Sequence, residues 1–250
     1  RALGLRQELE GPASPAVAHL LDQVASVHQE NGDYAAAEEV FRRALALRRS
    51  IFGERHLETA KSENNLGLLL YQRGQPKAAE ELHLLSLATR RALAGTESDA
   101  VGISLNNLAL ARFARDDVAG AADLNRQALA LSRRLHGNDH PGTANDMANL
   151  AYVLSELGDL GEAEALHREA VAVRRKVLGP DHPELARSLK HLGTLLQKLG
   201  RFEEAGAALR EGLAIRRRAS GEHHPLVAVD AMNLGLLALE RGELAAAEEI

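Results

Sequence analysis

The stretch Gly179-Pro180-Asp181-His182-Pro183 decides the fold of this 250-residue chain, because its pattern returns at a fixed distance. The same Gly-x-x-His-Pro pattern lies 42 residues earlier, around His140, and 42 residues later, around His224. Stepping by the same distance joins glycines near the middle of each copy: Gly32, Gly74, Gly158, Gly200 and Gly242, with Asp116 in the remaining place. Six copies in unbroken register predict a solenoid of stacked repeats.

Composition narrows the class of protein. Hydrophobic residues make up 45% of the chain but aromatic residues only 3%, so we expect a core of leucine, alanine and valine. There is no cysteine, which removes disulfides and thiolate metal sites, and the net charge of −5 argues against nucleic acid as a partner. The sequence has no apolar run of about 18 residues, so we expect no membrane span. We expect a cytoplasmic protein.

Each repeat is predicted to contain two helices. In the second copy the first helix covers about Leu57 to Arg73 and ends at Gly74, and the second covers about Pro76 to Leu93. The predicted fold class is therefore all-α. Proline after each loop histidine suits a first helical turn, and we expect Asp139 and Asp181 to cap the free N–H groups there.

The third copy departs from the others at two places. Asp116 replaces the turn glycine, and Gly95 to Asp99 form an atypical linking loop. We expect distorted turns in this copy.

Two rows of small residues predict where helices approach closely. Along the first helices the small residues are Ala25, Gly67, Ala109, Ala151, Gly193 and Gly235. Along the second helices the small residues are Ala37, Ala79, Ala121, Ala163, Ala205 and Ala247. Backbones that pack within about 8–10 Å need such residues at the contact. Leucines at the positions equivalent to Leu66 are predicted to fill the spaces between them.

The repeated pattern resembles a known family. Leu-Gly/Ala-x-x-Leu-x-x-x-Gly-x-x-x-x-Ala-Glu, followed by Arg-Arg-Ala-Leu-Ala-x-Arg-Arg and Gly-Pro-Asp-His-Pro, is similar to the 42-residue tetratricopeptide repeats of kinesin light chains and of bacterial light-chain-like proteins. The resemblance covers the full chain. It implies a right-handed superhelical solenoid of antiparallel helix pairs, whose first helices line a concave groove that binds an extended peptide or a partner's helix.

One face of the first helices is a candidate binding surface. Positions equivalent to Lys61, Asn65 and Leu68 share a face distinct from the Leu66 stripe. The Asn65 position recurs as Gln23, Asn107, Asn149, His191 and Asn233. Asparagine is unfavourable inside a helix, so its recurrence indicates a use. One hypothesis is that these amides hold the main chain of a peptide, as the family resemblance favours; the other is that they form a ladder between repeats.

The flanking positions vary, which predicts a ligand with an apolar anchor and acidic residues. Apolar residues mark the second and third repeats, and basic residues mark the fifth. The candidate peptide-binding residues are Lys61, Asn65, Leu68, Ile103, Asn107, Leu110, Asn145, Asn149, Tyr152, Arg187, Lys190, His191 and Asn233, with Phe113 and Lys198 beside them. A core contact is the favoured interpretation of Phe113, and a solvated charged face is the alternative interpretation of the basic residues.

Two further patterns are interpreted as structural. Arginines align near the ends of the second helices, in rows that include Arg48, Arg49, Arg174 and Arg217. We expect them to stabilise those helix ends and to pair with carboxylates such as Glu58, Glu184 and Glu222, rather than to bind phosphate.

The loop histidines are not expected to bind a metal. His140, His182 and His224 lie in successive repeats, too far apart for one ion. No catalytic or phosphate-binding motif occurs, so we expect no enzyme and no cofactor.

The leading hypothesis is a non-enzymatic interaction scaffold. The alternative is a sensor or regulatory segment of a larger signalling protein of the nucleotide-switch or protease type. We treat residues 1–250 as one solenoid of about six repeats, incomplete at both ends and cut from a longer array. In that case the helix that begins at Pro225 should expose Leu234, Leu237 and Leu239. Contacts at the ends, with another molecule or within the same chain, are also expected.

Overall fold

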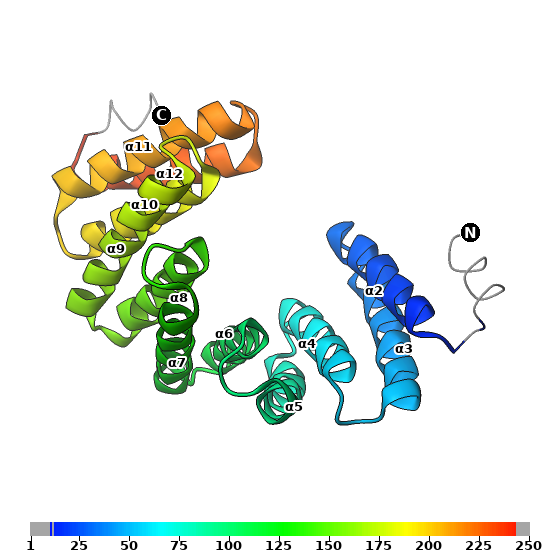
Figure 1. The fold of residues 1–250 in the computed structure, drawn as a ribbon. Helices are drawn as coiled ribbons and strands as arrows, with labels where there is room; N and C mark the ends of the chain where they lie inside the picture. Colours follow the sequence, from blue (N-terminus) through cyan, green and yellow to red (C-terminus); the bar gives the residue numbers. More distant parts are fainter. Residues whose placement is uncertain (1–10, 12, 244–250) are drawn as a thin grey trace. The chain divides into compact units, whose positions relative to one another are not determined.

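The computed structural model describes residue 11 and residues 13–243, and every regular element in this part of the chain is an α-helix (Figure 1). The first helices of the repeats are α2 (Pro15–Glu30), α4 (Leu57–Gln72), α6 (Asp99–Phe113), α8 (Pro141–Leu157), α10 (Pro183–Lys198) and α12 (Pro225–Glu240). The second helices are α3 (Tyr34–Phe52), α5 (Pro76–Ala94), α7 (Val118–His136), α9 (Leu160–Leu178) and α11 (Phe202–Ser220). The prediction of an all-α repeat solenoid is confirmed.

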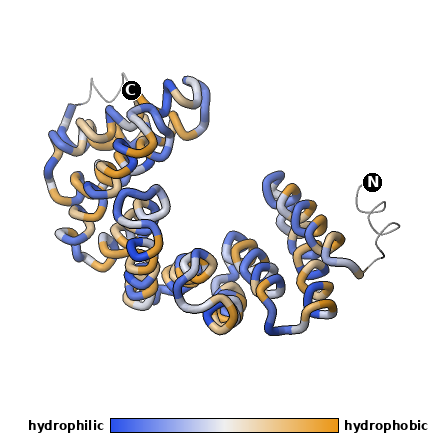
Figure 2. The backbone as a smooth tube through the Cα atoms, in the orientation of Figure 1, coloured by the Kyte–Doolittle hydropathy of each residue, from blue (hydrophilic) through white to orange (hydrophobic). Residues whose placement is uncertain are grey.

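The chain divides into two compact units, which are residues 1–131 and residues 132–250. In unit 1 each helix from α2 to α6 packs against the next one along the chain, and the same holds from α8 to α12 in unit 2. Hydrophobic and hydrophilic residues alternate along the helices (Figure 2). The apolar sides meet in the cores, around Leu21, Phe41 and Leu66 in unit 1 and around Leu185 and Leu213 in unit 2.

The loop histidines begin the first helices. The side chain of His56 accepts a hydrogen bond from the Glu58 amide at 3.1 Å, and His140, His182 and His224 cap α8, α10 and α12 in the same way. The prediction that Asp139 and Asp181 cap these helices is wrong. Both carboxylates instead form ion pairs, with Lys176 and Arg218. In all four helices the ring Nδ1 of the histidine lies 3.1–3.2 Å from an amide of the first turn, so histidine takes the capping role whether leucine or proline follows it.

The turn of the third repeat is not distorted, although glycine is missing there. Asp116 has a φ of 67°, close to the 72° of Gly74 at the equivalent place. The amide of Asp117 donates to the Arg112 carbonyl at 3.0 Å, as the amide of Gln75 donates to the Leu70 carbonyl at 2.9 Å. Aspartate is one of the few residues that adopts this left-handed conformation at low cost, so the expected distortion is wrong.

The small residues lie at the predicted close contacts. Within the described residues, the second-helix alanines from Ala37 to Ala205 are fully buried, whereas Ala247 lies outside the described residues. A Cβ atom on Gly193 would lie 2.7 Å from Leu209 Cγ and 3.3 Å from the Ala205 carbonyl oxygen. Glycine at this position therefore lets α10 lie directly against α11.

The last first helix is more buried than predicted. Leu239 of α12 is exposed, but Leu234 and Leu237 are buried against the neighbouring helices. The prediction that all three are exposed is wrong for two of them, because α11 and α10 already cover the core side of α12. None of the described helices has the length and apolar character needed to cross a membrane.

Replacing Gly193 with alanine tests the close approach. We expect the free energy of unfolding to fall by about 1–2 kcal/mol, since overpacking costs about 1–3 kcal/mol and the better helix propensity returns at most about 1 kcal/mol. Gly102→Ala in α6 is the matched control, because its added Cβ would make only an ordinary contact, 3.8 Å from Leu131 Cδ2, among the described residues. That variant should be neutral or more stable in urea unfolding, and equal losses in the two variants would contradict the packing argument.

Candidate functional site

The candidate surface is the exposed side of the first helices, which we describe for each unit separately. We call it the first-helix face of unit 1 (α2, α4 and α6) and of unit 2 (α8, α10 and α12). In unit 1, Lys61, Ile103 and Leu110 are exposed, and Leu68 is half-buried. In unit 2, Asn145, Asn149, Tyr152 and Arg187 are exposed, and Lys190, His191 and Asn233 are half-buried. The candidate residues therefore reach solvent in both units.

The asparagines of unit 1 differ from each other. Asn107 Nδ2 on α6 donates to Asn64 Oδ1 on α4 at 3.0 Å, so this amide joins two repeats. Asn65, one repeat earlier, instead lines a hollow between α2 and α4. The ladder hypothesis thus describes Asn107, while Asn65 faces an open space.

Similar bonds join other neighbouring first helices. Gln29 donates to Gln72 at 2.6 Å between α2 and α4, and Gln197 donates to Glu240 at 2.7 Å between α10 and α12. Each bond joins a residue to one 43 positions away, as does the Asn107–Asn64 bond. Amide side chains therefore tie successive repeats along these faces.

Two asparagines of unit 2 are also engaged with the protein, Asn145 at the position equivalent to Lys61 and Asn233 at the position equivalent to Asn65. Asn145 Oδ1 accepts hydrogen bonds from Arg174 and, at 3.2 Å, from Arg187. Asn233 Nδ2 donates at 2.9 Å to the carbonyl of Val229 in its own helix. These two amides have protein partners that a ligand would have to replace.

Three aromatic rings lie together in unit 2. Tyr152 of α8 meets His191 of α10 edge to face at 6.5 Å, and His191 stacks on His167 of α9 at 6.1 Å. Burial and the nearby positive charges of Lys190, Arg187 and Arg174 lower the pKa of His191 to about 3. The imidazole is therefore neutral at physiological pH, and it offers a ligand a ring surface rather than a charge.

The basic character predicted for the fifth repeat is smaller than expected. His191 is neutral, Lys198 Nζ pairs with Glu156 at 2.7 Å, and Arg187 pairs with Glu184. Lys190 has no ion pair among the described residues. The prediction of a basic cluster is thus wrong for His191, and two of the other three cations are paired, Arg187 within its own helix and Lys198 with a carboxylate of α8. Phe113 is half-buried at the end of α6.

The buried arginines have structural partners, as expected. Arg48 Nη1 at the end of α3 contacts Asp22 Oδ2 at 2.7 Å, and its Nε lies 3.3 Å from Glu58. Arg216 Nε contacts Asp230 at 3.0 Å, and Arg217 Nε pairs with Glu222 at 2.9 Å. Arg174 lies 3.4 Å from Glu184. Arg48, Arg174 and Arg216 thus join their second helices to a neighbouring first helix, while the more exposed Arg217 pairs with the loop before α12, so all four arginines have carboxylate partners.

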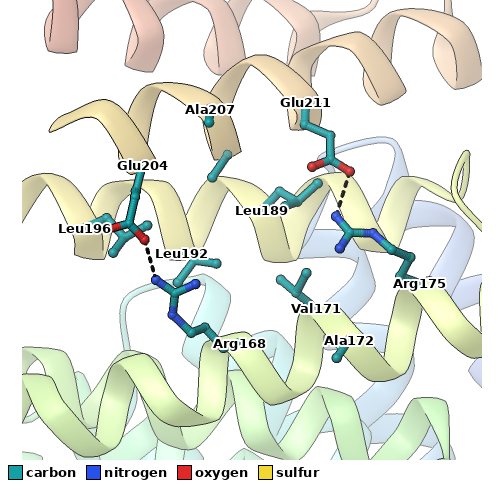
Figure 3. A pocket seen from close by; sticks show the side chains of 11 residues that line it. Arg168, Val171, Ala172, Arg175, Leu189, Leu192, Leu196, Glu204, Ala207 and Glu211 are labelled. Atoms are coloured by element: carbon teal, nitrogen blue, oxygen red, sulfur yellow. Dashed lines mark hydrogen bonds and ion pairs between the residues drawn. The ribbon is translucent and has the colours of Figure 1, made fainter. Parts of the chain in front are cut away.

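A second hollow lies among the helices α9, α10 and α11 (Figure 3). It measures about 350 Å³, and Leu189, Leu192 and Leu196 of α10 form part of its lining. Two ion pairs cross from α9 to α11, Arg168–Glu204 at 2.8 Å and Arg175–Glu211 at 2.7 Å. Because the pairs bridge the two second helices, this hollow is a gap between repeats that charged side chains span.

Sequence reasoning missed three buried polar residues. Asp22 comes one position before Gln23, beside the asparagine row. Its equivalents in the next two repeats, Asn64 and Asn106, are also polar, and this recurrence was the signal that could have indicated a buried polar position. His83 and His167 occupy the second-helix position that holds Phe41 and Leu209 in other repeats. A polar residue in an apolar row was the signal there.

Asn107→Ala tests the ladder hypothesis. Asn64 is buried, and losing its donor should lower the free energy of unfolding by about 1–3 kcal/mol. Asn65→Ala is the matched control one repeat earlier, because no described residue bonds to that amide, and we expect a change below about 0.5 kcal/mol. Urea unfolding monitored by circular dichroism measures both; a control as destabilised as Asn107→Ala would contradict the hypothesis.

The buried histidines predict acid sensitivity. Burial lowers the pKa of His83 and of His167 from 6.5 to about 4, with Arg90 and Arg174 adding to the effect. In the unfolded chain these two imidazoles therefore take up protons near pH 6.5, whereas in the folded chain they take up protons only near pH 4. Stability is full above pH 6.5 and falls as the pH decreases towards 4. Between about pH 7 and about pH 5 we expect each of these imidazoles to cost about 2 kcal/mol.

Urea unfolding at the two pH values measures this loss. The variant to compare carries His83→Asn and His167→Asn, because asparagine stands at the equivalent position as Asn125. Its free energy of unfolding should fall less between the two pH values than that of the unchanged chain. An unchanged pH dependence in that variant would contradict the assignment.

Comparison with known proteins supports the repeat architecture. The family model described as tetratricopeptide repeat matches residues 1–50, 15–92, 100–176, 145–218 and 189–250. None of the curated proteins compared with the chain matches it.

Solved structures share the fold. A kinesin-light-chain-type protein of nearly identical TPR-like repeats from Podosopora anserina has a TM-score of 0.71 and 25% identity over 83% of this chain and 98% of its own. BtubC (BKLC) from P. vanneervenii has a TM-score of 0.74 and 24% identity over 90% of this chain and 88% of its own. A Rap protein complexed with competence and sporulation factor has a TM-score of 0.69 and 15% identity over 98% of this chain and 71% of its own.

Proposed function

Because the chain belongs to the tetratricopeptide repeat family, we propose that it is a non-enzymatic interaction scaffold that binds an extended peptide or a partner's helix on its first-helix faces. The observation that carries the proposal is the exposure of large apolar side chains on those helices. Ile103 and Leu110 of α6 are 52% and 42% exposed, and Tyr152 of α8 is 47% exposed. Exposed apolar side chains on one face of a helix can act as anchors for an extended peptide or a partner's helix.

The charged groups support binding rather than catalysis. The buried arginines are held by hydroxyl, amide, carbonyl or carboxylate groups, and the buried histidines are kept neutral by desolvation. Within the described ranges, no three histidine or acidic side chains are placed to hold a metal ion. An acid–base or nucleophilic role needs a perturbed group in a cleft that a substrate enters, whereas His83 lies wholly inside the core.

The Rap protein of the same fold was solved as a complex with competence and sporulation factor, which is a precedent for ligand binding by a protein of this fold. In the present chain we infer that apolar side chains of the ligand contact Ile103 and Leu110, and that acidic side chains approach Lys61 or Lys190. Both lysines have no ion pair among the described residues. We propose a cytoplasmic location for this interaction.

Changing Ile103 and Leu110 together to serine tests the proposed face. A peptide selected from a random display library on the full chain serves as the ligand, and its affinity is measured by fluorescence anisotropy. We expect binding to weaken by about tenfold or more, because two apolar contacts of the ligand are lost, while the unfolding midpoint changes little.

The matched control replaces Leu84 and Leu85 with serine. These residues are 42% and 50% exposed on the second helix α5, so the change in surface polarity is the same. Affinity should be unchanged in this variant. Equal effects of the two double substitutions, or a selection that yields no binding peptide, would contradict the proposed function.

A further inference from the structure

A hollow of about 350 Å³ opens between α9 and α11 in unit 2, with α10 beneath it (Figure 3). Buried aliphatic side chains form its floor: Val171, Leu189, Leu192, Leu196 and Ala208. The exposed alanines Ala172 and Ala207 border its opening. We propose that this hollow binds one leucine side chain of a partner polypeptide. The site goes beyond the proposed function, since it opens between second helices and not on a first-helix face.

The first observation is that side chains are shorter here than in the other repeats. Ala208 of α11 occupies the position that holds leucine or valine in each earlier second helix, as Val40, Leu82, Leu124 and Leu166. Val171 of α9 occupies the position that holds leucine in the other second helices of the described chain, as Leu45, Leu87, Leu129 and Leu213. Both replacements line the hollow. Relative to two leucines they remove about four side-chain carbon atoms, which is the size of one leucine side chain.

The equivalent place in unit 1 is filled by the chain itself. Leu45 of α3 is buried there, and Leu82 of α5 packs against the same core cluster, which also contains Leu66 and Leu70 of α4. In unit 2 the equivalents of these residues are, in the same order, Val171, Ala208, Leu192 and Leu196. The repeat thus has room for a leucine that the chain does not supply in unit 2. A leucine from a partner would be stabilised in this space because apolar surface on both sides leaves water.

Ion pairs limit the length of the hollow. The pair Arg168–Glu204, at 2.8 Å, lies at one end, and the pair Arg175–Glu211, at 2.7 Å, lies at the other (Figure 3). The two arginines are two turns apart on α9, which is about 10 Å. A leucine side chain fits within this length, whereas a lipid acyl chain of about 15 Å, half of the hydrocarbon core of a bilayer, does not. The hollow therefore suits a single side chain.

The charges at the rim favour a polypeptide as the source of that side chain. Each end carries one positive and one negative side chain, and these four side chains are 45–48% exposed. A charged group that entered the hollow would lose water and meet only aliphatic atoms, so the entering group must be apolar. The N–H and C=O groups on either side of a leucine residue are neutral dipoles that can bond to the carboxylates and guanidinium groups of the rim. A free hydrocarbon lacks these groups.

Nuclear magnetic resonance with small probes tests the site on the chain of 250 residues. The probe is N-acetyl-leucine methylamide, and the readout is the methyl signals of Val171, Leu192 and Ala208. The alanine and glutamate derivatives have the same backbone with a shorter or a charged side chain. Isoamyl alcohol has the isobutyl group without the backbone, so it separates a polypeptide ligand from a small apolar molecule.

We expect the leucine probe to shift these methyl signals and to bind at least about fivefold more tightly than each of the other three compounds. Ala208→Leu supplies the side chain that most earlier repeats have. It should raise the urea midpoint of unfolding and weaken the leucine probe by about tenfold, because the hollow is then filled from within. Val171→Leu adds less bulk from the opposite wall and should weaken the probe by about threefold.

Ala88→Leu is the matched control, because it adds the same side chain at an exposed place on α5 in unit 1. Binding of the leucine probe should be unchanged in this variant. It should also be unchanged when Ile103 and Leu110 are both replaced with serine, so the site and the proposed function can fail separately.

Absence of any shift up to the solubility limit of the leucine probe would overturn the proposal. Equal binding of any of the other three compounds, or unchanged binding in both Ala208→Leu and Val171→Leu, would also overturn it. A lower urea midpoint of Ala208→Leu would do the same, because it would mean that the hollow has no room for a leucine side chain.

Discussion

The close approach of helix backbones within each repeat is the constraint on which the rest of the structure depends. Alanine or glycine must stand at the contact, because a larger side chain would separate the helices and displace every later repeat. The buried alanines from Ala37 to Ala205 and the glycine at Gly193 meet this need. A fixed spacing of 42 residues follows, since each repeat must present its small residues to the next one in the same register.

Apolar packing alone does not specify how neighbouring repeats lie, and buried polar groups add directional contacts. Arg48 reaches back to Asp22 and forward to Glu58, and Arg216 reaches forward to Asp230. A buried guanidinium is costly unless its hydrogen bonds are satisfied, so these contacts restrict the position of each second helix against the first helices. The same need explains why Ser62, Ser104 and Ser188 lie on the core side of α4, α6 and α10, where each hydroxyl accepts a bond from an arginine.

The polar contacts between repeats also shape the ligand surface. Where the amides bond to each other, as Asn107 does to Asn64, the first-helix face is closed and its hydrogen bonds serve stability. Where the pair is unjoined, as at Asp22 and Asn65, the two side chains line a hollow between α2 and α4. Equivalent positions thus join two repeats in one place and line an open hollow in another. In unit 2 the half-buried neutral ring of His191 stacks on the buried ring of His167.

The sequence by itself determined the repeat length, the helix pairs and the small-residue contacts, because each depends on periodic spacing that local chemistry expresses directly. It also placed the candidate residues on the exposed side of the first helices. Only the tertiary structure decided which of them bond to a neighbouring repeat. Asn107 and Asn65 occupy equivalent positions, yet one is bonded and the other lines a hollow, because the residue facing each comes from a different repeat. The capping histidines, the conformation of Asp116 and the pKa of His191 likewise depend on neighbours distant along the chain or on backbone geometry, which periodicity does not contain.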